Sequence, residues 1–315
     1  QSLYPEQFEK LMRDIQALCP VVGKSLERIP RFNGLDQKSS DRRQPVSSES
    51  LRVAFQGEPG AYSEQAIHMV FDDTTEVIPR RGFADVFESV LSGDAKYGMV
   101  PVENTLGGTI NETLDLLNSY PDLTVVGEKQ IRIRHNLIGV PGATLDSIRK
   151  VFSHPQGLAQ CTDFLEKELA QAEAVPFFDT AGAVAYIAKQ NDRSCAAIAS
   201  STAASYHHME ILRDSIETDS SNFTRFYIIC REELAHVFRS TMPVDRVAMV
   251  FSVHDRPGSL FEALQVLSAY GLNMKKLESR PIPGKPWEYA FFVESELIEE
   301  NKFKNAIEEL VASCA

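Results

Sequence analysis

Short apolar runs alternate with polar loops and helical patterns from residue 51 onward. Each run ends in a loop of small or polar residues, and apolar residues then recur at the spacing of a helix. The runs that we predict as strands are residues 51–55, 97–102, 150–153, 175–178 and 196–199. Strands that alternate with helices are typical of α/β units on a mostly parallel sheet. Ligands of such sheets bind beyond the carboxyl ends of the strands, so we expect a site at the loops after these runs.

The order of elements changes in the last part of the chain. The pattern predicts a strand at 247–253, a helix from about Pro257 to Gly271, two strands joined by a turn at 281–286, and a closing amphipathic helix. This order is close to the ferredoxin-like plan. We expect the last strand of that plan to be missing, because the sequence stops at Ala315, just after the closing helix.

Residues 1–50 differ from both blocks. A helical pattern covers residues 5–18, and residues 33–50 are polar and aperiodic, as linkers are. We predict an N-terminal helix and linker, and assign no function to them. No basic segment followed by an apolar stretch occurs, so we expect a cytoplasmic protein. Because the sequence starts with Gln1 rather than Met, the plastid stroma after removal of a transit peptide is the alternative.

The 315-residue chain is acidic, with a formal net charge of -12 at pH 7. Nucleic acids and anionic membranes bind basic surfaces, so we expect neither as a partner. No run reaches the roughly 20 apolar residues that a membrane helix needs. The five cysteines are scattered and form no C-x-x-C pair, so we expect neither a disulfide framework nor a metal site. An anionic substrate would need local positive charge from arginines or helix N-termini.

One polar segment enters an apolar strand at residues 222–226, Asn-Phe-Thr-Arg-Phe. This order places Thr224 and Arg225 at the mouth of the strand. The planar, charged fork of arginine suits carboxylates, and the threonine hydroxyl can donate or accept a proton. The structural alternative is that Arg225 forms a surface or inter-domain salt bridge.

The segment resembles the Thr-Arg-Phe signature of prephenate and arogenate dehydratases. Four more stretches resemble motifs of this family, in the family's order: FQGEPGAYSE (55–64), VPVENTLGGT (100–109), SHPQGLAQC (153–161) and DTAGA (179–183). Two stretches of the last block resemble the regulatory motifs of the family's ACT domain: PGSLFEAL (257–264) and LESRP (277–281). The resemblance covers roughly residues 51–313.

The resemblance implies both a fold and a reaction. The fold is an α/β dehydratase domain at residues 51–232, with two lobes similar to type II periplasmic binding proteins, followed by a ferredoxin-like (α+β) ACT domain at residues 245–315. The reaction converts prephenate into phenylpyruvate, CO2 and water in phenylalanine biosynthesis, under feedback control by phenylalanine. The family works as homodimers or homotetramers and needs no metal or organic cofactor.

Two other functions stay open at this point. Arogenate dehydratases form phenylalanine directly, and their substrate differs from prephenate only in an amino group that replaces a keto group. No single residue decides between the two substrates on physical grounds. The second alternative is a two-lobed module that binds a small anion without turnover, although simple capture does not require the Thr-Arg-Phe segment.

The resemblance also assigns roles to residues. We expect Thr224 to hydrogen-bond the leaving hydroxyl and pass it a proton, and Arg225 to supply positive charge for a carboxylate or to brace the site. Glu103 is the candidate upstream acid if burial raises its pKa, and its structural alternative is an acceptor for loop amides. The residues expected to line the substrate cleft are Tyr62, Ser63, Asn104, Thr105, Gln156, Asp179, Thr180, Ser200, Asn222 and Phe226.

The last block is expected to bind phenylalanine. Backbone amides at a helix start suit an amino-acid carboxylate, and Glu278 and Asn273 could meet its ammonium group. The full set expected at this site is Gly258, Ser259, Leu260, Asn273, Glu278, Ser279 and Arg280. Lys275 departs from the family, which usually carries Thr there. The alternative is that this domain only dimerises.

Overall fold

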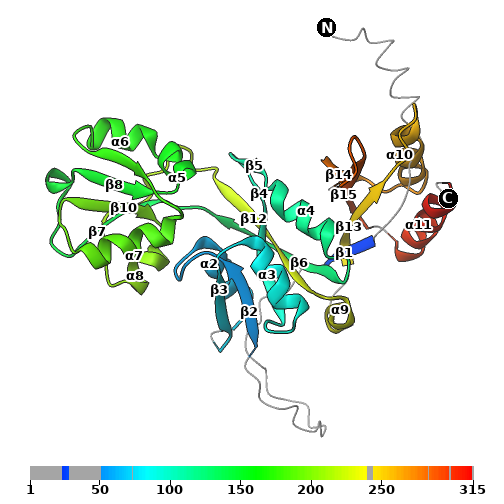
Figure 1. Ribbon diagram of the computed structural model, residues 1–315, viewed down its shortest axis with the longest axis horizontal. Helices are drawn as coiled ribbons and strands as arrows, with labels where there is room; N and C mark the ends of the chain where they lie inside the picture. Colours follow the sequence, from blue (N-terminus) through cyan, green and yellow to red (C-terminus); the bar gives the residue numbers. More distant parts are fainter. Residues whose placement is uncertain are drawn as a thin grey trace, which may run out of the picture. The chain divides into compact units, whose positions relative to one another are not determined.

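The computed structural model describes residues 23–27, 51–72, 74–239, 244–282, 284–297 and 299–313 (Figure 1). The predicted helix at 5–18 and the linker at 33–50 lie outside these ranges. The chain divides into two compact units, and each is described by itself. The larger unit comprises Pro30–Thr113 and Lys129–Ile229, and the smaller unit comprises Gln1–Ile29, Leu114–Glu128 and Cys230–Ala315.

The larger unit contains one whole sheet and most of another. The latter, described first, is built on strands with apolar residues facing both sides, and two of its strands extend into the smaller unit. Its strand order is β3-β2-β4-β12-β6. The strands are β2 (Arg52–Gln56), β3 (Glu76–Arg80), β4 (Tyr97–Asn104), β6 (Leu123–Arg132) and β12 (Phe223–Arg231). Strand β2 is parallel to β3 and β4, whereas β12 is antiparallel to β4. The short β5 (Gly108–Thr109) also pairs with β4, and the helices that follow β2 and β3 are α2 (Tyr62–His68) and α3 (Phe83–Leu91).

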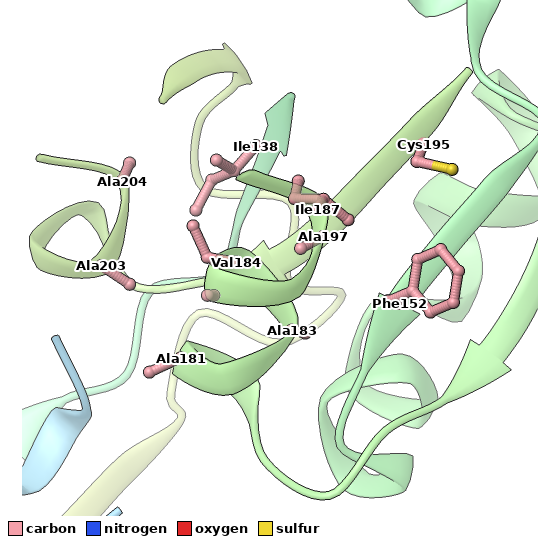
Figure 2. Packing of buried hydrophobic residues seen from close by; sticks show 11 residues of the cluster. Ile138, Phe152, Ala181, Ala183, Val184, Ile187, Cys195, Ala197, Ala203 and Ala204 are labelled. Carbon is pink, nitrogen blue, oxygen red and sulfur yellow. The ribbon is translucent and has the colours of Figure 1, made fainter. Parts of the chain in front are cut away.

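The second sheet has the order β11-β7-β10-β8-β9. Its strands are β7 (Asn136–Gly139), β8 (Lys150–Ser153), β9 (Glu173–Pro176), β10 (Cys195–Ala199) and β11 (Glu210–Arg213). The helical segments are η1 (Leu145–Ser147), α5 (Pro155–Gln160), α6 (Thr162–Glu168), α7 (Thr180–Gln190) and α8 (Ser201–Tyr206). Figure 2 shows the core formed by α7 and these strands, in which many buried side chains are alanines. Small side chains let a helix lie close to the sheet below it.

The chain crosses twice between these sheets, from β6 to β7 and from β11 back to β12. Backbone hydrogen bonds hold the two crossing segments together: Ile133 N–H donates to Asn222 O over 2.8 Å, and Ile216 N–H donates to His135 O over 2.8 Å. Two α/β lobes joined by a double crossing confirm the predicted two-lobed plan.

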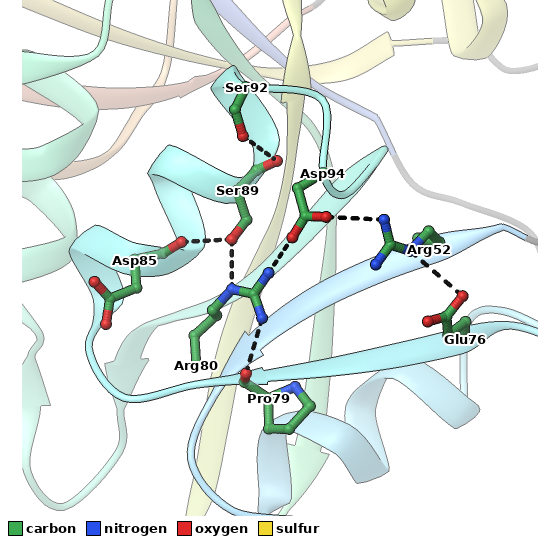
Figure 3. Close-up of polar contacts among 8 residues, drawn as sticks. All are labelled: Arg52, Glu76, Pro79, Arg80, Asp85, Ser89, Ser92 and Asp94. Atoms are coloured by element: carbon green, nitrogen blue, oxygen red, sulfur yellow. Dashed lines mark hydrogen bonds and ion pairs between the residues drawn. The ribbon is translucent and has the colours of Figure 1, made fainter.

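An ion-pair network fixes the edge of the first sheet (Figure 3). Asp94 accepts from Arg52 over 2.9 Å and pairs with Arg80 at close range. The Arg80 Nε also donates to Ser89 Oγ of α3 over 2.6 Å. These contacts tie the end of β3 to α3 and to the turn before β4.

The smaller unit contains an antiparallel sheet of order β1-β13-β15-β14. Its strands are β1 (Gly23–Glu27), β13 (Val244–Ser252), β14 (Met274–Pro281) and β15 (Tyr289–Glu296). Helices α10 (Ser259–Ala269) and α11 (Glu300–Ser313) enclose an apolar core on one face of the sheet. The unit also holds α9 (Glu232–Arg239) and most of α4 (Asn111–Ser119), which begins in the larger unit.

Two features of the smaller unit were not predicted. First, the expected sheet had three strands, but β1 pairs antiparallel with β13 and adds a fourth. The sequence Gly-Lys-Ser-Leu-Glu of β1 holds one large apolar residue and no alternation, so it carried no strand signal. Second, residues 114–128 belong to this unit although they lie inside the predicted domain at 51–232.

Candidate active site

A cavity of about 510 Å³ lies in the larger unit, and loops from both of its sheets line it. This volume is in the range of small-molecule sites. Eight of the residues expected in the cleft or in catalysis line it: Tyr62, Ser63, Asn104, Gln156, Asp179, Thr180, Thr224 and Phe226. The loops follow the carboxyl ends of strands such as β2, β8 and β9, as open α/β sheets predict.

Asn104 and Thr224 form the centre of this cavity. They lie opposite each other on the antiparallel strands β4 and β12, and both are buried. The Asn104 Oδ1 accepts from the backbone N–H groups of Leu106 (3.0 Å) and Gly107 (2.7 Å). These two donors fix the orientation of the Asn104 amide, so its Nδ2 must face Thr224.

The direction of the next hydrogen bond follows from this orientation. Asn104 Nδ2 donates to Thr224 Oγ1 over 2.9 Å, so the threonine oxygen is an acceptor there. Within the described ranges, no residue accepts the proton of the Thr224 hydroxyl. The proton is therefore available to a molecule bound in the cavity.

From Asn104, a chain of hydrogen-bonded polar groups continues along the cavity wall and across both lobes. Asn104 Nδ2 also donates to Asn222 Oδ1 over 2.8 Å, and Asn222 Nδ2 donates to Gln160 Oε1 over 3.0 Å. The same oxygen of Gln160 lies 2.8 Å from His135 Nε2, and His135 Nδ1 lies 2.9 Å from Tyr62 Oη. Buried amides are stable only when paired in this way.

Three residues expected to line the cleft do not line it. Asn222 is fully buried and supports Asn104 from behind. Thr105 is exposed and donates to Ser221 O over 2.7 Å. Ser200 caps α8 and donates to Gly60 O over 2.6 Å. All three hold loops of the cavity in place rather than contributing to its surface.

Arg225 and Glu103 lie on the opposite side of their strands from the cavity. Successive residues of a strand point to opposite faces, so the neighbours of Thr224 and Asn104 face away from it. The two side chains form an ion pair of 2.7 Å, and the Arg225 guanidinium lies over the Tyr227 ring. Neither residue lines the cavity. Glu103 is 39% exposed, so the burial that its proposed acid role requires is lacking. The geometry supports a bracing role for Arg225, with Glu103 as its ion-pair partner.

The comparisons with known proteins agree with this geometry. The prephenate dehydratase family matches residues 53–234, which include every residue of the cavity, and the ACT domain family matches residues 247–311. The chain belongs to the prephenate dehydratase family.

Named relatives of this prephenate dehydratase family member come from plants and bacteria. It is 37% identical over 281 residues to "Arogenate dehydratase 3, chloroplastic" of Arabidopsis thaliana, and the match covers 84% of this chain but 65% of the relative. It is 36% identical over 263 residues to the "Bifunctional chorismate mutase/prephenate dehydratase" of Aquifex aeolicus (strain VF5), with 83% of this chain and 70% of the relative covered. The chain therefore spans about two thirds of the length of these relatives.

A solved structure shows the same fold with a ligand. The prephenate dehydratase of Arthrobacter aurescens, whose structure is in complex with L-Phe, superposes with a TM-score of 0.74 at 25% sequence identity. The superposition covers 82% of this chain and 85% of that chain. The larger and smaller units of our chain thus together have the fold of a prephenate dehydratase.

The cavity also contains residues that the sequence did not reveal, including Arg81, Glu112, His135, Phe178 and Gln160. Gln160 lies four residues after Gln156 on α5, so helical spacing could have placed both on one face. His135 lies in the crossing from β6 to β7, where no periodic pattern points to it. His154 caps α5 through its Nδ1 and also lines the cavity.

Within the described ranges, no cluster of His, Cys, Asp or Glu could hold a metal ion, and no helix is long and apolar enough to cross a membrane.

The residues expected to bind phenylalanine fall into two groups in the smaller unit. Gly258 caps α10 with a φ of 91°, and the buried Ser259 hydroxyl has no hydrogen-bond partner in the described part of the chain. Leu260 packs on the core beside them. The second group is held by other side chains: Asn273 Nδ2 donates to Glu296 over 2.8 Å, and Arg280 binds Asp115 of α4 through two bonds of 2.8 and 2.7 Å. Glu278 lies 3.8 Å from Lys276, and Ser279 is exposed.

Burial controls the protonation of three groups in or near the cavity wall. It lowers the pKa of His135, so the imidazole is neutral at neutral pH and the Nε2–H faces Gln160. Burial also raises the pKa of Tyr62 well above its usual value and that of the Cys161 thiol to about 12, so both stay protonated.

The pKa of His135 predicts how stability depends on pH. Because the pKa is lower in the folded state than the ordinary value of 6.5, the unfolded state binds the proton more tightly. The His135 contribution is complete above pH 6.5 and is lost as the pH falls toward the folded-state pKa. Denaturant titrations between about pH 7.5 and 5.5 should show a steeper loss of unfolding free energy for the wild type than for His135→Gln. Equal slopes would contradict the assignment.

Proposed function

We propose that this chain is a decarboxylating dehydratase that converts prephenate into phenylpyruvate, CO2 and water. The observation that carries the proposal is the Thr224 hydroxyl, which accepts from Asn104 and has its own proton free for a ligand in the cavity. Membership of the prephenate dehydratase family supports the reaction class. The activity is our proposal because the match covers only 65% of the Arabidopsis relative.

The reaction is a 1,4-elimination across a cyclohexadiene ring. The bond between the ring and its carboxylate breaks to release CO2, and its electron pair moves through the ring and expels the C4 hydroxyl. Thr224 donates a hydrogen bond to the departing oxygen and stabilises its negative charge. A threonine hydroxyl is too weak an acid to give up its proton for good, so the proton that completes the water molecule comes from solvent. This route does not need Glu103, which lies away from the cavity.

The rest of the cavity holds the ring and weakens the solvation of the leaving carboxylate. Apolar groups from several loops line it: Ala61, Phe83, Pro101, Ile110, Ile133 and Phe226. A carboxylate that loses its charge as CO2 gains from surroundings that hydrogen-bond it poorly. Aromatisation of the ring supplies the driving force, so positioning accounts for much of the remaining rate enhancement.

The proposed role of Thr224 does not distinguish prephenate from arogenate. Arogenate remains the alternative substrate, because the Thr224 contact involves the ring hydroxyl, which both molecules carry.

The plant relative carries the word chloroplastic in its name. For this chain we propose the cytoplasm, with the plastid stroma as the alternative, and a homodimer or homotetramer as the assembly.

Substitution of Thr224 tests the proposed chemistry. With prephenate or arogenate as substrate, Thr224→Val should lower kcat at least about a hundredfold and leave KM within about threefold, because the hydrogen bond strengthens in the transition state. Thr224→Ser keeps the hydroxyl and should retain most of the activity. Equal loss of binding and turnover in the valine variant would remove the role given to Thr224. A folded wild type that binds both compounds and converts neither would favour the anion-binding module instead.

We also propose that phenylalanine binds the smaller unit and lowers turnover. The support is the buried, unpartnered hydroxyl of Ser259 at the start of α10, together with the L-Phe complex of the Arthrobacter relative. Backbone amides at the start of a helix suit the carboxylate of an amino acid.

Phenylalanine added to the full chain should therefore reduce the rate, and Ser259→Ala should raise the half-inhibitory concentration severalfold without changing the uninhibited rate. Ser268→Ala, an exposed position on the same helix, is the matched control. A rate that does not respond to phenylalanine would support a domain that only dimerises.

A further inference from the structure

Arg81 is the single lysine or arginine among the residues that line the cavity. It follows β3 directly, its side chain is exposed, and it forms no ion pair with any residue in the described ranges. The guanidinium of its neighbour Arg80, in contrast, is bound by Ser89 and Asp94, which hold it against α3 (Figure 3). The two adjacent arginines thus differ: Arg80 holds the strand end in place, whereas Arg81 lines the cavity and has no ion-pair partner in the described ranges.

The charges around the cavity make this cation necessary for binding an anion. The chain carries a net charge of -12, and two carboxylates, Glu112 and Asp179, also line the cavity. Asp179 is engaged in capping α7, where its Oδ1 accepts from Gly182 N–H over 2.5 Å. Arg225, expected to supply the positive charge, is bound to Glu103 on the other face. A dicarboxylate that enters this cavity therefore meets Arg81 as its one permanent positive partner.

We propose that Arg81 binds the side-chain carboxylate of the substrate, the one that the reaction retains. This inference rests on the proposed function and adds the orientation of the substrate. An arginine fork stabilises a carboxylate strongly. If it held the carboxylate that leaves as CO2, it would stabilise the ground state and slow the reaction. Bound to the retained carboxylate, Arg81 contributes the same binding free energy to the substrate complex and to the transition state.

Burial along the cavity agrees with this orientation. Thr224, which donates to the C4 hydroxyl, is only 8% exposed, whereas Arg81 is exposed. In the substrate, the C4 hydroxyl lies at one end of the ring, and the carbon at the other end carries both the leaving carboxylate and the side chain. The side-chain carboxylate extends farther from the ring than the leaving carboxylate, which is attached to the ring directly. A ring whose hydroxyl end points inward to Thr224 therefore directs its side-chain carboxylate farthest outward, toward Arg81.

Phenylpyruvate is the probe that distinguishes the two carboxylates, because it keeps the side-chain carboxylate and lacks the ring carboxylate. In the full chain, Arg81→Gln should raise both the KM for substrate and the inhibition constant of phenylpyruvate by about tenfold, and leave kcat within about threefold. Arg81→Lys should restore part of both. Arg193→Gln, an exposed arginine outside the cavity, should change none of these values.

Two results overturn the inference while the wild type remains active. Unchanged KM and inhibition constants would show that Arg81 binds neither carboxylate. A raised kcat with unchanged phenylpyruvate inhibition would place it on the leaving carboxylate. If the wild type converts neither prephenate nor arogenate, the proposed function fails. Calorimetric binding of phenylpyruvate then tests Arg81 separately: weaker binding in Arg81→Gln supports it, and equal or undetectable binding in both proteins refutes it.

Discussion

The orientation of one buried amide determines the chemistry of this cavity. Two backbone N–H groups of the loop after β4 bind Asn104 Oδ1, so the amide nitrogen has to face Thr224. Gly107 also leaves room for Gln156, because a Cβ at this position would lie 2.1 Å from Gln156 Nε2 and displace that side chain. A hydrogen bond has one donor and one acceptor, so fixing the amide makes Thr224 Oγ1 the acceptor and turns the Thr224 proton away from Asn104. The loop sequence thereby constrains a proton on the neighbouring strand β12.

Other residues of the larger unit keep the Asn104 amide in place, and Arg81 supplies the positive charge that a neutral amide cannot give. Asn222, Gln160 and His135 continue the hydrogen-bond chain into the second lobe, so both lobes contribute to the position of Thr224. The chain is made of neutral groups, because burial keeps His135 unprotonated. Because these hydrogen-bonded groups are neutral and the protein as a whole is acidic, an anion in the cavity needs a cation at the exposed end, and Arg81 provides it. Proton donation and anion binding are thus separated along the cavity.

Part of this arrangement could be predicted from the sequence. The alternation of apolar runs and loops predicted the two α/β lobes, and the motifs placed Asn104 and Thr224 together before the register was known. The strand period of two also implied that Arg225 and Thr224 could not both face the cavity, but the motif grouped them. Arg81 was not predicted because the partners that hold Arg80 come from the tertiary fold, and nothing in Pro-Arg-Arg-Gly separates one arginine from the other. The pairing of β1 was missed for a similar reason, since it depends on a distant strand rather than on a local pattern.

The direction of the hydrogen bond between Asn104 and Thr224 is the central claim, and Asn104→Asp tests it most directly. A carboxylate at this position accepts the Thr224 proton instead of donating to its oxygen, so the hydroxyl turns away from the substrate. Gln156→Glu adds the same charge to the same cavity without touching Thr224 and is the matched control. The account predicts that kcat at saturating substrate falls at least about a hundredfold in Asn104→Asp and much less in Gln156→Glu. A similar kcat in the two variants would contradict the account and show that the Thr224 hydroxyl does not stabilise the departing oxygen.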